Sequence, residues 1–173
     1  YNLADVTVLP SSNEGWGLSL TESMMAGTMI IGNTTGGMQD QMRFQDDKGE
    51  WYTPSLDVPS NHRGTYKKHG QWAMPVYPTN ISLAGSPMTP YIYDDRCAPE
   101  DIAKAIYDVY KLGKDERNKR GMKGRIFAMS DEARMTAESM AKNVVEAVDE
   151  TFENFIPRKR FDLSLVEAPK KKY

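Results

Sequence analysis

The sequence predicts an α/β fold in which a parallel sheet is flanked by helices. Two short apolar runs rich in β-branched residues, 5–10 and 28–32, are typical of buried strands. A helical pattern follows each run, over 18–26 and from 38 to 44, and Gly27 stands where a helix commonly ends. Strands and helices that alternate in this way indicate right-handed βαβ crossovers and hence a parallel sheet.

Each predicted strand leads into a loop that contains glycine. Residues 11–17 follow the first strand, and residues 34–37 follow the second. Glycine allows unusual backbone torsions and close approach to a ligand. The free N–H groups and the dipole at a helix start favour phosphate binding. Because ligands of such sheets bind at the carboxyl ends of the strands, both loops are predicted to line a binding site.

Composition limits the class of protein. The chain has 173 residues, of which 39% are hydrophobic and 27% charged, which indicates one globular domain. A net charge of -2 gives no reason to expect nucleic acid as a partner. Cys97 is the only cysteine, so an intrachain disulfide is excluded and a reducing, cytoplasmic location is expected. The sequence shows no apolar run of membrane-spanning length and no signal peptide, and the lack of an initiator methionine suggests a fragment.

The glycine loops carry a recognisable set of motifs. These are Ala4-Asp5-Val6, Leu9-Pro10-Ser11-Ser12, Glu14-Gly15-Trp16-Gly17, Glu22-Ser23-Met24-Met25-Ala26-Gly27 and Gly36-Gly37, with seven residues between Glu14 and Glu22 (an E-x7-E pattern). They resemble the donor-binding, C-terminal half of GT-B glycosyltransferases of the family-4 (group 1) type. Those enzymes are retaining transferases that use a nucleotide-sugar donor. The resemblance is strong over residues 1–44 and weak over residues 91–156.

The resemblance implies roles for individual residues. Glu14 matches the glutamate that contacts the transferred sugar near the reacting centre, and it is the candidate catalytic residue. Glu22 matches the glutamate that binds the ribose hydroxyls. The remaining donor-binding candidates face the diphosphate or form the second glycine turn: Gly15, Trp16, Gly17, Leu18, Ser19, Gly36 and Gly37. Asp40 departs from the pattern, because a glutamate usually follows the second glycine turn.

The resemblance also implies the ligands and the missing parts. The substrate would be a UDP-, GDP- or ADP-sugar, and the activity that of a hexosyltransferase-like enzyme. Separately, the sequence shows no cluster of metal ligands, so no protein-bound metal or other cofactor is expected. The family's acceptor-binding N-terminal domain and the basic residues that hold the diphosphate lie upstream of this sequence. The chain is therefore expected to need that N-terminal domain as its partner and to be inactive alone.

Other interpretations remain open at the level of sequence. Glu14 could cap the helix, Glu22 could be a solvated helix residue, and Trp16 is expected to pack against the loop rather than stack on a sugar. The chain could also belong to another GT-B enzyme, such as a sugar-nucleotide epimerase or a glycogen-type synthase. A third alternative is a non-catalytic binding domain that kept the fold.

The rest of the chain is predicted in less detail. Residues 1–156 would form the nucleotide-sugar-binding Rossmann-like domain, with an irregular insertion at about 45–90 that contains short hairpins around 71–76. His62 and His69 are expected in an exposed polar loop, with an acceptor or phosphate contact as the alternative.

The C-terminal third is predicted to be mainly helical. A short strand at 91–93 precedes helices over 99–113 and 115–129, the second of which is interrupted by Gly121 and Gly124. Ser130 would cap the next helix. The apolar stripe of that helix is expected to pack in the core, and it comprises Ala137, Met140, Ala141, Val144, Val148, Phe152 and Phe155. Residues 157–173 form a basic tail, for which contact with a membrane surface is possible but not favoured.

Overall fold

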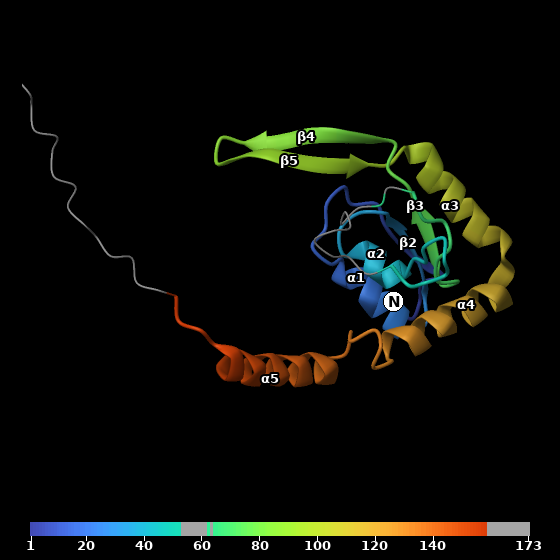
Figure 1. Cartoon of the computed structure of the whole chain (residues 1–173). Coiled ribbons are helices and arrows are strands. Elements are labelled where there is room, and N and C mark those ends of the chain that lie inside the picture. Colours follow the sequence, from blue (N-terminus) through green and yellow to red (C-terminus); the bar gives the residue numbers. More distant parts are fainter. Residues whose placement is uncertain (53–61, 63, 159–173) are drawn as a thin grey trace, which may run out of the picture.

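The computed structural model describes residues 1–52, 62 and 64–158, and these residues form an α/β fold as predicted. Its sheet contains three parallel strands in the order β1-β2-β3: β1 (Val6–Leu9), β2 (Met29–Asn33) and β3 (Ala73–Val76). The register pairs Val6 with Met29 and Ile30 with Ala73. Helices surround this sheet, whereas a hairpin and the last helix extend away from it (Figure 1). The insertion predicted at 45–90 therefore includes a strand of the main sheet, where short hairpins were expected.

The described residues also form five helices. They are α1 (Leu18–Met25), α2 (Met38–Met42), α3 (Pro99–Lys111), α4 (Gly113–Ala128) and α5 (Ala137–Asn154). The end of α1 confirms the predicted role of Gly27, which has a φ of 81°. The amide of Gly27 donates to the Met24 carbonyl and that of Thr28 to the Ser23 carbonyl, each at 2.9 Å. This pair of bonds is a Schellman motif, and it turns the chain from α1 into β2.

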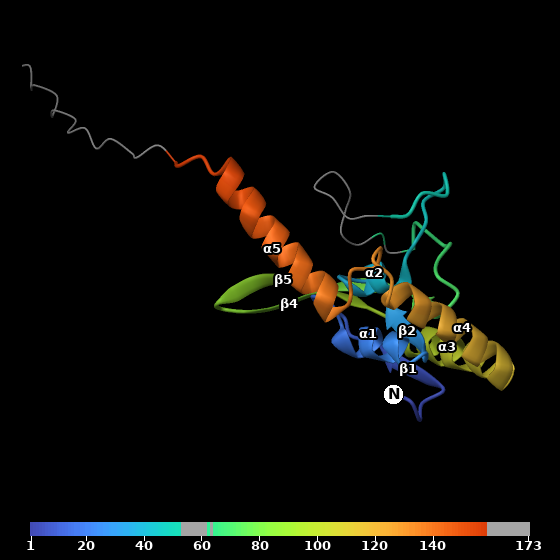
Figure 2. The same ribbon diagram turned by 90° about the horizontal axis from the view of Figure 1, so that it is seen from below.

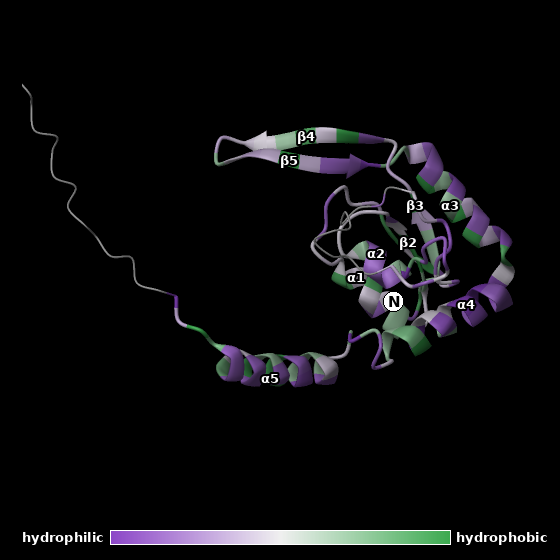
Figure 3. Ribbon diagram, in the orientation of Figure 1, coloured by the Kyte–Doolittle hydropathy of each residue, from purple (hydrophilic) through white to green (hydrophobic). Residues whose placement is uncertain are grey.

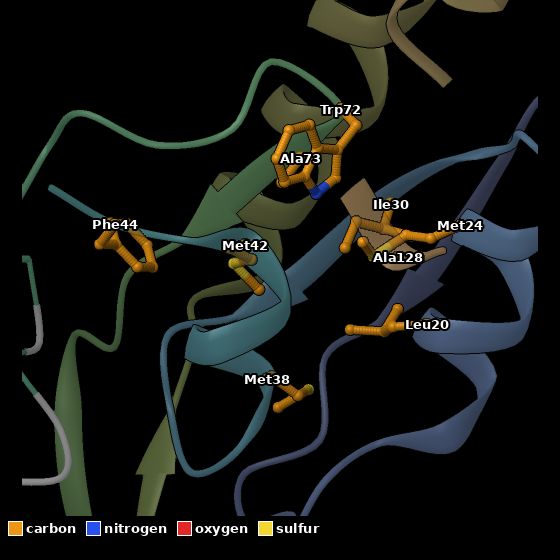
Figure 4. Packing of buried hydrophobic residues seen from close by; sticks show 9 residues of the cluster. All are labelled: Leu20, Met24, Ile30, Met38, Met42, Phe44, Trp72, Ala73 and Ala128. Atoms are coloured by element: carbon orange, nitrogen blue, oxygen red, sulfur yellow. The ribbon is translucent and has the colours of Figure 1, made fainter. Parts of the chain in front are cut away.

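The core lies on both faces of the sheet. Along β2, Ile30 faces one buried cluster, and Met29 and Ile31 face the other, as the two-residue period of a strand requires. Figure 4 shows the first cluster, which comprises Leu20, Met24, Ile30, Met38, Met42, Phe44, Trp72, Ala73 and Ala128. The second cluster comprises Met29, Ile31, Val76, Ala105 and Val109. Because both faces are covered, every residue of β2 is buried.

Two glycines allow α4 to approach the sheet closely. A Cβ atom on Gly121 would lie 1.9 Å from the Gly27 carbonyl oxygen, and one on Gly124 would lie 2.8 Å from Cβ of Trp72. The helix is continuous through both positions. The prediction that these glycines interrupt it is therefore wrong, since they serve helix packing.

A long hairpin projects from the body. Its strands are β4 (Asn80–Ser86) and β5 (Thr89–Arg96), which pair antiparallel and form a sheet of their own. The predicted strand at 91–93 is confirmed as part of β5. Figures 1 and 2 both show that the hairpin extends beyond the helices that cover the main sheet.

The last helix also stands apart from the core. Along α5, hydrophobic and hydrophilic residues alternate (Figure 3), but none of its residues is buried. Phe152 is 82% exposed, for example. The prediction that this stripe packs in the core is therefore wrong.

The residue that caps α5 was also predicted wrongly. At the start of α5, the Thr136 side chain accepts a hydrogen bond from the Ser139 amide, whereas the hydroxyl of Ser130 donates to the Phe127 carbonyl. In the part of the chain that the structure describes, no helix is long and apolar enough to cross a membrane.

Candidate donor-binding site

The two glycine loops meet at the carboxyl ends of β1 and β2. A Cβ atom on Gly36 would lie 1.9 Å from the Glu14 carbonyl oxygen, and one on Gly37 would lie 2.4 Å from the Gly15 carbonyl oxygen. Gly36 also has a φ of 51°, which other L residues rarely adopt. The contact of these two backbones therefore requires glycine. It places the predicted site residues 14–17 beside Gly36 and Gly37.

A buried polar network fixes the first loop. The indole N–H of Trp16 donates to the Thr21 hydroxyl at 2.8 Å, and that hydroxyl donates to Oε1 of Gln41 at 2.9 Å. The Gln41 amide then donates to the carbonyls of Trp16 and Gly17. Loop, α1 and α2 are thereby joined. Trp16 supports the loop as expected, whereas Gln41 had no recognisable signal in the sequence because its partners are distant in the chain.

At the start of α1, the backbone N–H groups of Leu18 and Ser19 have no hydrogen-bond partner among the residues that the structure describes. Gly17 occupies the N-cap position with φ 81° and ψ 61°, and none of the described side chains caps the helix. Leu18 and Ser19 follow it in the first turn, where backbone N–H groups have no partner within the helix. Together with the helix dipole, these groups suit an anion such as a diphosphate.

The two glutamates lie on the surface at this edge. Glu14 is half-buried in the loop, and Glu22 is exposed one turn after Leu18 on the same face of α1. Among the described residues, no side chain bonds to the Glu14 carboxylate. The hydroxyl of Tyr1 donates to Glu22 Oε2 at 2.8 Å, and this bond raises the pKa of Tyr1. One oxygen of Glu22 thus already accepts a hydrogen bond from a hydroxyl group, which is the kind of bond that a ribose hydroxyl would make.

A second network ties the hairpin to the same edge. Asn33, the last residue of β2, donates to the carbonyls of Ser11 and Asp95 at 2.9 and 2.8 Å. Thr35 donates to the Asp95 carboxylate at 2.9 Å, and the Asp95 amide donates to the Ser12 carbonyl at 2.9 Å. Ser11, Ser12 and Thr35 lie in the predicted loops, whereas Asn33 and Asp95 had not been predicted as part of the site. A polar Asn33 at the end of an apolar run was the available signal.

His62 is buried, so its prediction as part of an exposed loop is wrong. Its ring lies against Phe44, Tyr52 and Tyr66, with a centroid distance of 4.2 Å to Phe44. Burial, aided by Lys67, lowers the pKa of His62 to about 4. Burial also lowers the pKa of His69. Neutral imidazoles thus fill space here, and within residues 1–52, 62 and 64–158 no group of three or more His, Cys, Asp or Glu could hold a metal ion.

Comparison with known proteins associates this edge with glycosyltransferases. Residues 1–59 match the family described as "Glycosyl transferases group 1". An uncharacterized glycosyltransferase of Methanocaldococcus jannaschii is 28% identical over 112 residues, which cover 65% of this chain and 26% of that protein. The D-inositol 3-phosphate glycosyltransferase of Thermomonospora curvata is 44% identical over 43 residues, or 25% of this chain and 10% of that protein.

The matches have a limited extent. The chain spans about a quarter of the length of the first relative and a tenth of the second. No solved structure matches the chain significantly. The family match nevertheless covers β1, α1, β2 and α2, and with them both glycine loops and both glutamates. The first 59 residues, which include both glycine loops, are thus similar in sequence to the group 1 glycosyl transferases.

Proposed function

We propose that this chain forms the donor-binding part of a retaining glycosyltransferase that takes a sugar from a UDP-, GDP- or ADP-sugar. The main support is that the family match falls on the segment where two glycine loops touch at the carboxyl edge of the sheet. That edge is the usual ligand position of open α/β sheets. Both relatives are named as glycosyltransferases, which agrees with a transferase rather than a binding domain.

The proposed roles follow the positions of the side chains. The N–H groups at the start of α1, after Gly17, bind the diphosphate. Glu22 accepts the ribose hydroxyls, for which an exposed carboxylate is well suited. Glu14 contacts the sugar that is transferred. Catalysis then depends on positioning the donor and stabilising the charge of the leaving diphosphate.

Donor binding tests the role of Glu22. The Glu22→Gln variant should bind a nucleotide sugar more weakly by about 1–3 kcal/mol, the usual range for losing a charge-assisted hydrogen bond. Titration calorimetry with UDP-, GDP- and ADP-sugars measures this difference. Glu138→Gln, at an exposed position in the first turn of α5, is the matched control and should bind as the wild type does. Equal donor affinity in all three proteins would remove Glu22 from the site.

Turnover tests the role of Glu14. In the parent enzyme, Glu14→Ala should lower kcat/KM strongly while the thermal midpoint changes little, because the half-buried loop carboxylate forms no bond in the described structure. Loss of folding would instead make Glu14 structural, and normal turnover would make it incidental. The products of the reaction separate a transferase from an epimerase.

We also propose that the acceptor-binding domain of the parent protein covers the stripe on α5. Its support is the exposure of Val144, Val148 and Phe152, which is unusual for one face of an amphipathic helix. Without that domain, the isolated 173 residues should bind a donor weakly and transfer no sugar. The test is to measure nucleoside diphosphate release and glycosylated product from the isolated chain. Acceptor-dependent turnover would overturn this part of the proposal.

A further inference from the structure

A pocket lies on the side of the glycine loop where Trp16 is located. It has a volume of about 390 Å³, within the range of small-molecule sites. Trp16 from the loop, Asp40 from α2, Trp51, and Arg134 from the connection between α4 and α5 all line it. Segments that are far apart in the sequence thus converge on one cavity.

The pocket contains unusual backbone conformations. Within the described ranges, Arg43 and Arg134 are the non-glycine residues with positive φ, at 52° and 53°, and both line this pocket. A left-handed conformation costs about 1–2 kcal/mol for such a residue, and strain of this kind concentrates at functional sites. Arg43 adopts this conformation as the C-cap of α2, and Arg134 adopts it in the connection before α5, so both arginines lie where the chain turns at the wall of the pocket.

Contacts hold Arg43 firmly in place. Its guanidinium lies 3.8 Å from the ring centroid of Trp51 and 4.7 Å from that of Phe127. It also forms a two-point ion pair with Glu132. Because Arg43 is already neutralised by Glu132, it contributes a rigid wall to the pocket rather than a free positive charge.

The remaining groups favour a neutral ligand with many hydroxyl groups. Asp40 and Glu132 balance Arg43 and Arg134, so the pocket as a whole does not select for an anion. Asp40 is half-buried, and its burial raises the pKa of its carboxyl. No other described residue donates a hydrogen bond to that carboxylate, so a ligand hydroxyl would meet an open acceptor. The guanidinium of Arg43 covers one face of the Trp51 ring, but Trp51 remains 44% exposed, and the uncovered part of the ring offers a flat apolar surface.

We propose that this pocket binds a saccharide, with an apolar face of the sugar ring on Trp51 and a hydroxyl group on Asp40. A sugar ring combines apolar C–H faces with a rim of hydroxyls, and the pocket presents the complement of both. Trp16 and Arg134 also line an adjoining pocket of about 340 Å³ that reaches Met140 of α5, which leaves room for a second sugar unit. This inference goes beyond the proposed function, because it needs no nucleotide and does not depend on donor binding.

The test is a titration of the isolated full chain with mono- and oligosaccharides that carry no nucleotide, followed by NMR. Saturable binding in the millimolar range is expected, with shifts at the Trp16 and Trp51 indole N–H signals. Asp40→Asn and Trp51→Ala should each weaken binding about tenfold, as expected for losing a charge-assisted bond or an aromatic platform. As controls, Asp115→Asn makes the same change at an exposed position outside the pocket, and Tyr93→Ala removes another exposed aromatic side chain outside it; both variants should bind normally.

Several outcomes would overturn the proposal. One is the absence of saturable binding to a folded wild-type chain across the panel. Another is binding that both pocket variants retain but Glu22→Gln loses, which would place the saccharide on the donor loop. A third is displacement of the saccharide by inorganic phosphate, which would identify an anion site. Donor binding that is lost while saccharide binding persists would instead count against the proposed function alone.

Discussion

The contact between the two glycine loops predicts how four glycine-to-alanine substitutions will differ. Gly36 has both a positive φ of 51° and a Cβ position 1.9 Å from the Glu14 carbonyl oxygen. Gly37 has the close contact but a φ of -67°. Gly113 has a φ of 74° with open space around it, and Gly15 has open space and no positive φ. The four sites therefore include one with both steric contact and backbone strain, one with each cause alone, and one with neither.

The expected magnitudes follow from these two causes. An alanine in the left-handed region loses about 1–2 kcal/mol, and overpacking against a fixed backbone about 1–3 kcal/mol. Gly36→Ala should therefore lower the free energy of unfolding by about 2–5 kcal/mol. For a chain of this size, that corresponds to a fall in Tm of about 4–20 °C. Gly113→Ala and Gly37→Ala should each show one part of the effect, and Gly15→Ala should stay within about 0.5 kcal/mol of the wild type.

Thermal and urea denaturation followed by circular dichroism measure these differences. The order of stability should be Gly15→Ala first, then the two intermediate variants, then Gly36→Ala. If Gly36→Ala were as stable as the wild type, the loops would not be in backbone contact. If Gly15→Ala were as damaging as Gly36→Ala, loop flexibility rather than packing would explain the need for glycine.

Three further predictions concern other parts of the structure. Gln41→Ala should lower the free energy of unfolding by about 2–4 kcal/mol in urea denaturation, because the Trp16 carbonyl and the hydroxyl proton of Thr21 both lose the partner that Gln41 provides. The exposed Gln71→Ala should change the free energy of unfolding little. The pKa of His62 is lowered to about 4 from an ordinary 6.5, so the unfolded chain takes up the proton first as the pH falls. Stability should thus be lost between pH 6.5 and 4, by up to about 3 kcal/mol, and a His62→Gln variant that keeps the same pH dependence of Tm would contradict this. Gly121→Ala should destabilise the protein despite a gain of about 1 kcal/mol in helix propensity, because its Cβ atom would clash with the Gly27 carbonyl oxygen. Asn118→Ala, at an exposed position on the same helix, is the control. A stabilised Gly121→Ala variant would show that α4 lies farther from the sheet.

The parts of the fold that depend on local chemistry could be predicted from the sequence. The apolar runs of β1 and β2, the glycine loops that follow them and the end of α1 at Gly27 each have a short-range cause. Strand β3 lacks such a signal, because Pro75 interrupts its apolar run. Proline is tolerated there since β3 lies at the edge of the sheet, a fact that only the tertiary structure shows.

Other errors arose where distant contacts decide the outcome. Gly121 and Gly124 look like helix breakers by propensity, but they are sites of close packing in α4. The helical spacing of apolar residues along α5 predicted an apolar face, but the sequence does not indicate which part of the protein would cover that face. At the candidate site, the motifs identified the loops, whereas Gln41, Asn33 and Asp95 hold those loops through partners that are many residues away.

The attachment of the hairpin has a consequence for the order of folding. Strands β4 and β5 are joined by a tight turn, and hairpins of this kind form in about 1–10 μs. The pairing of Ile30 with Ala73 instead closes a long loop, which makes the parallel sheet intrinsically slower. An isolated hairpin is only marginally stable, so it persists once Asp95 bonds to Ser12 and Thr35. The last step of sheet assembly therefore orders the hairpin and the glycine loops at the same time, and kinetic probes in the two regions should report one common rate.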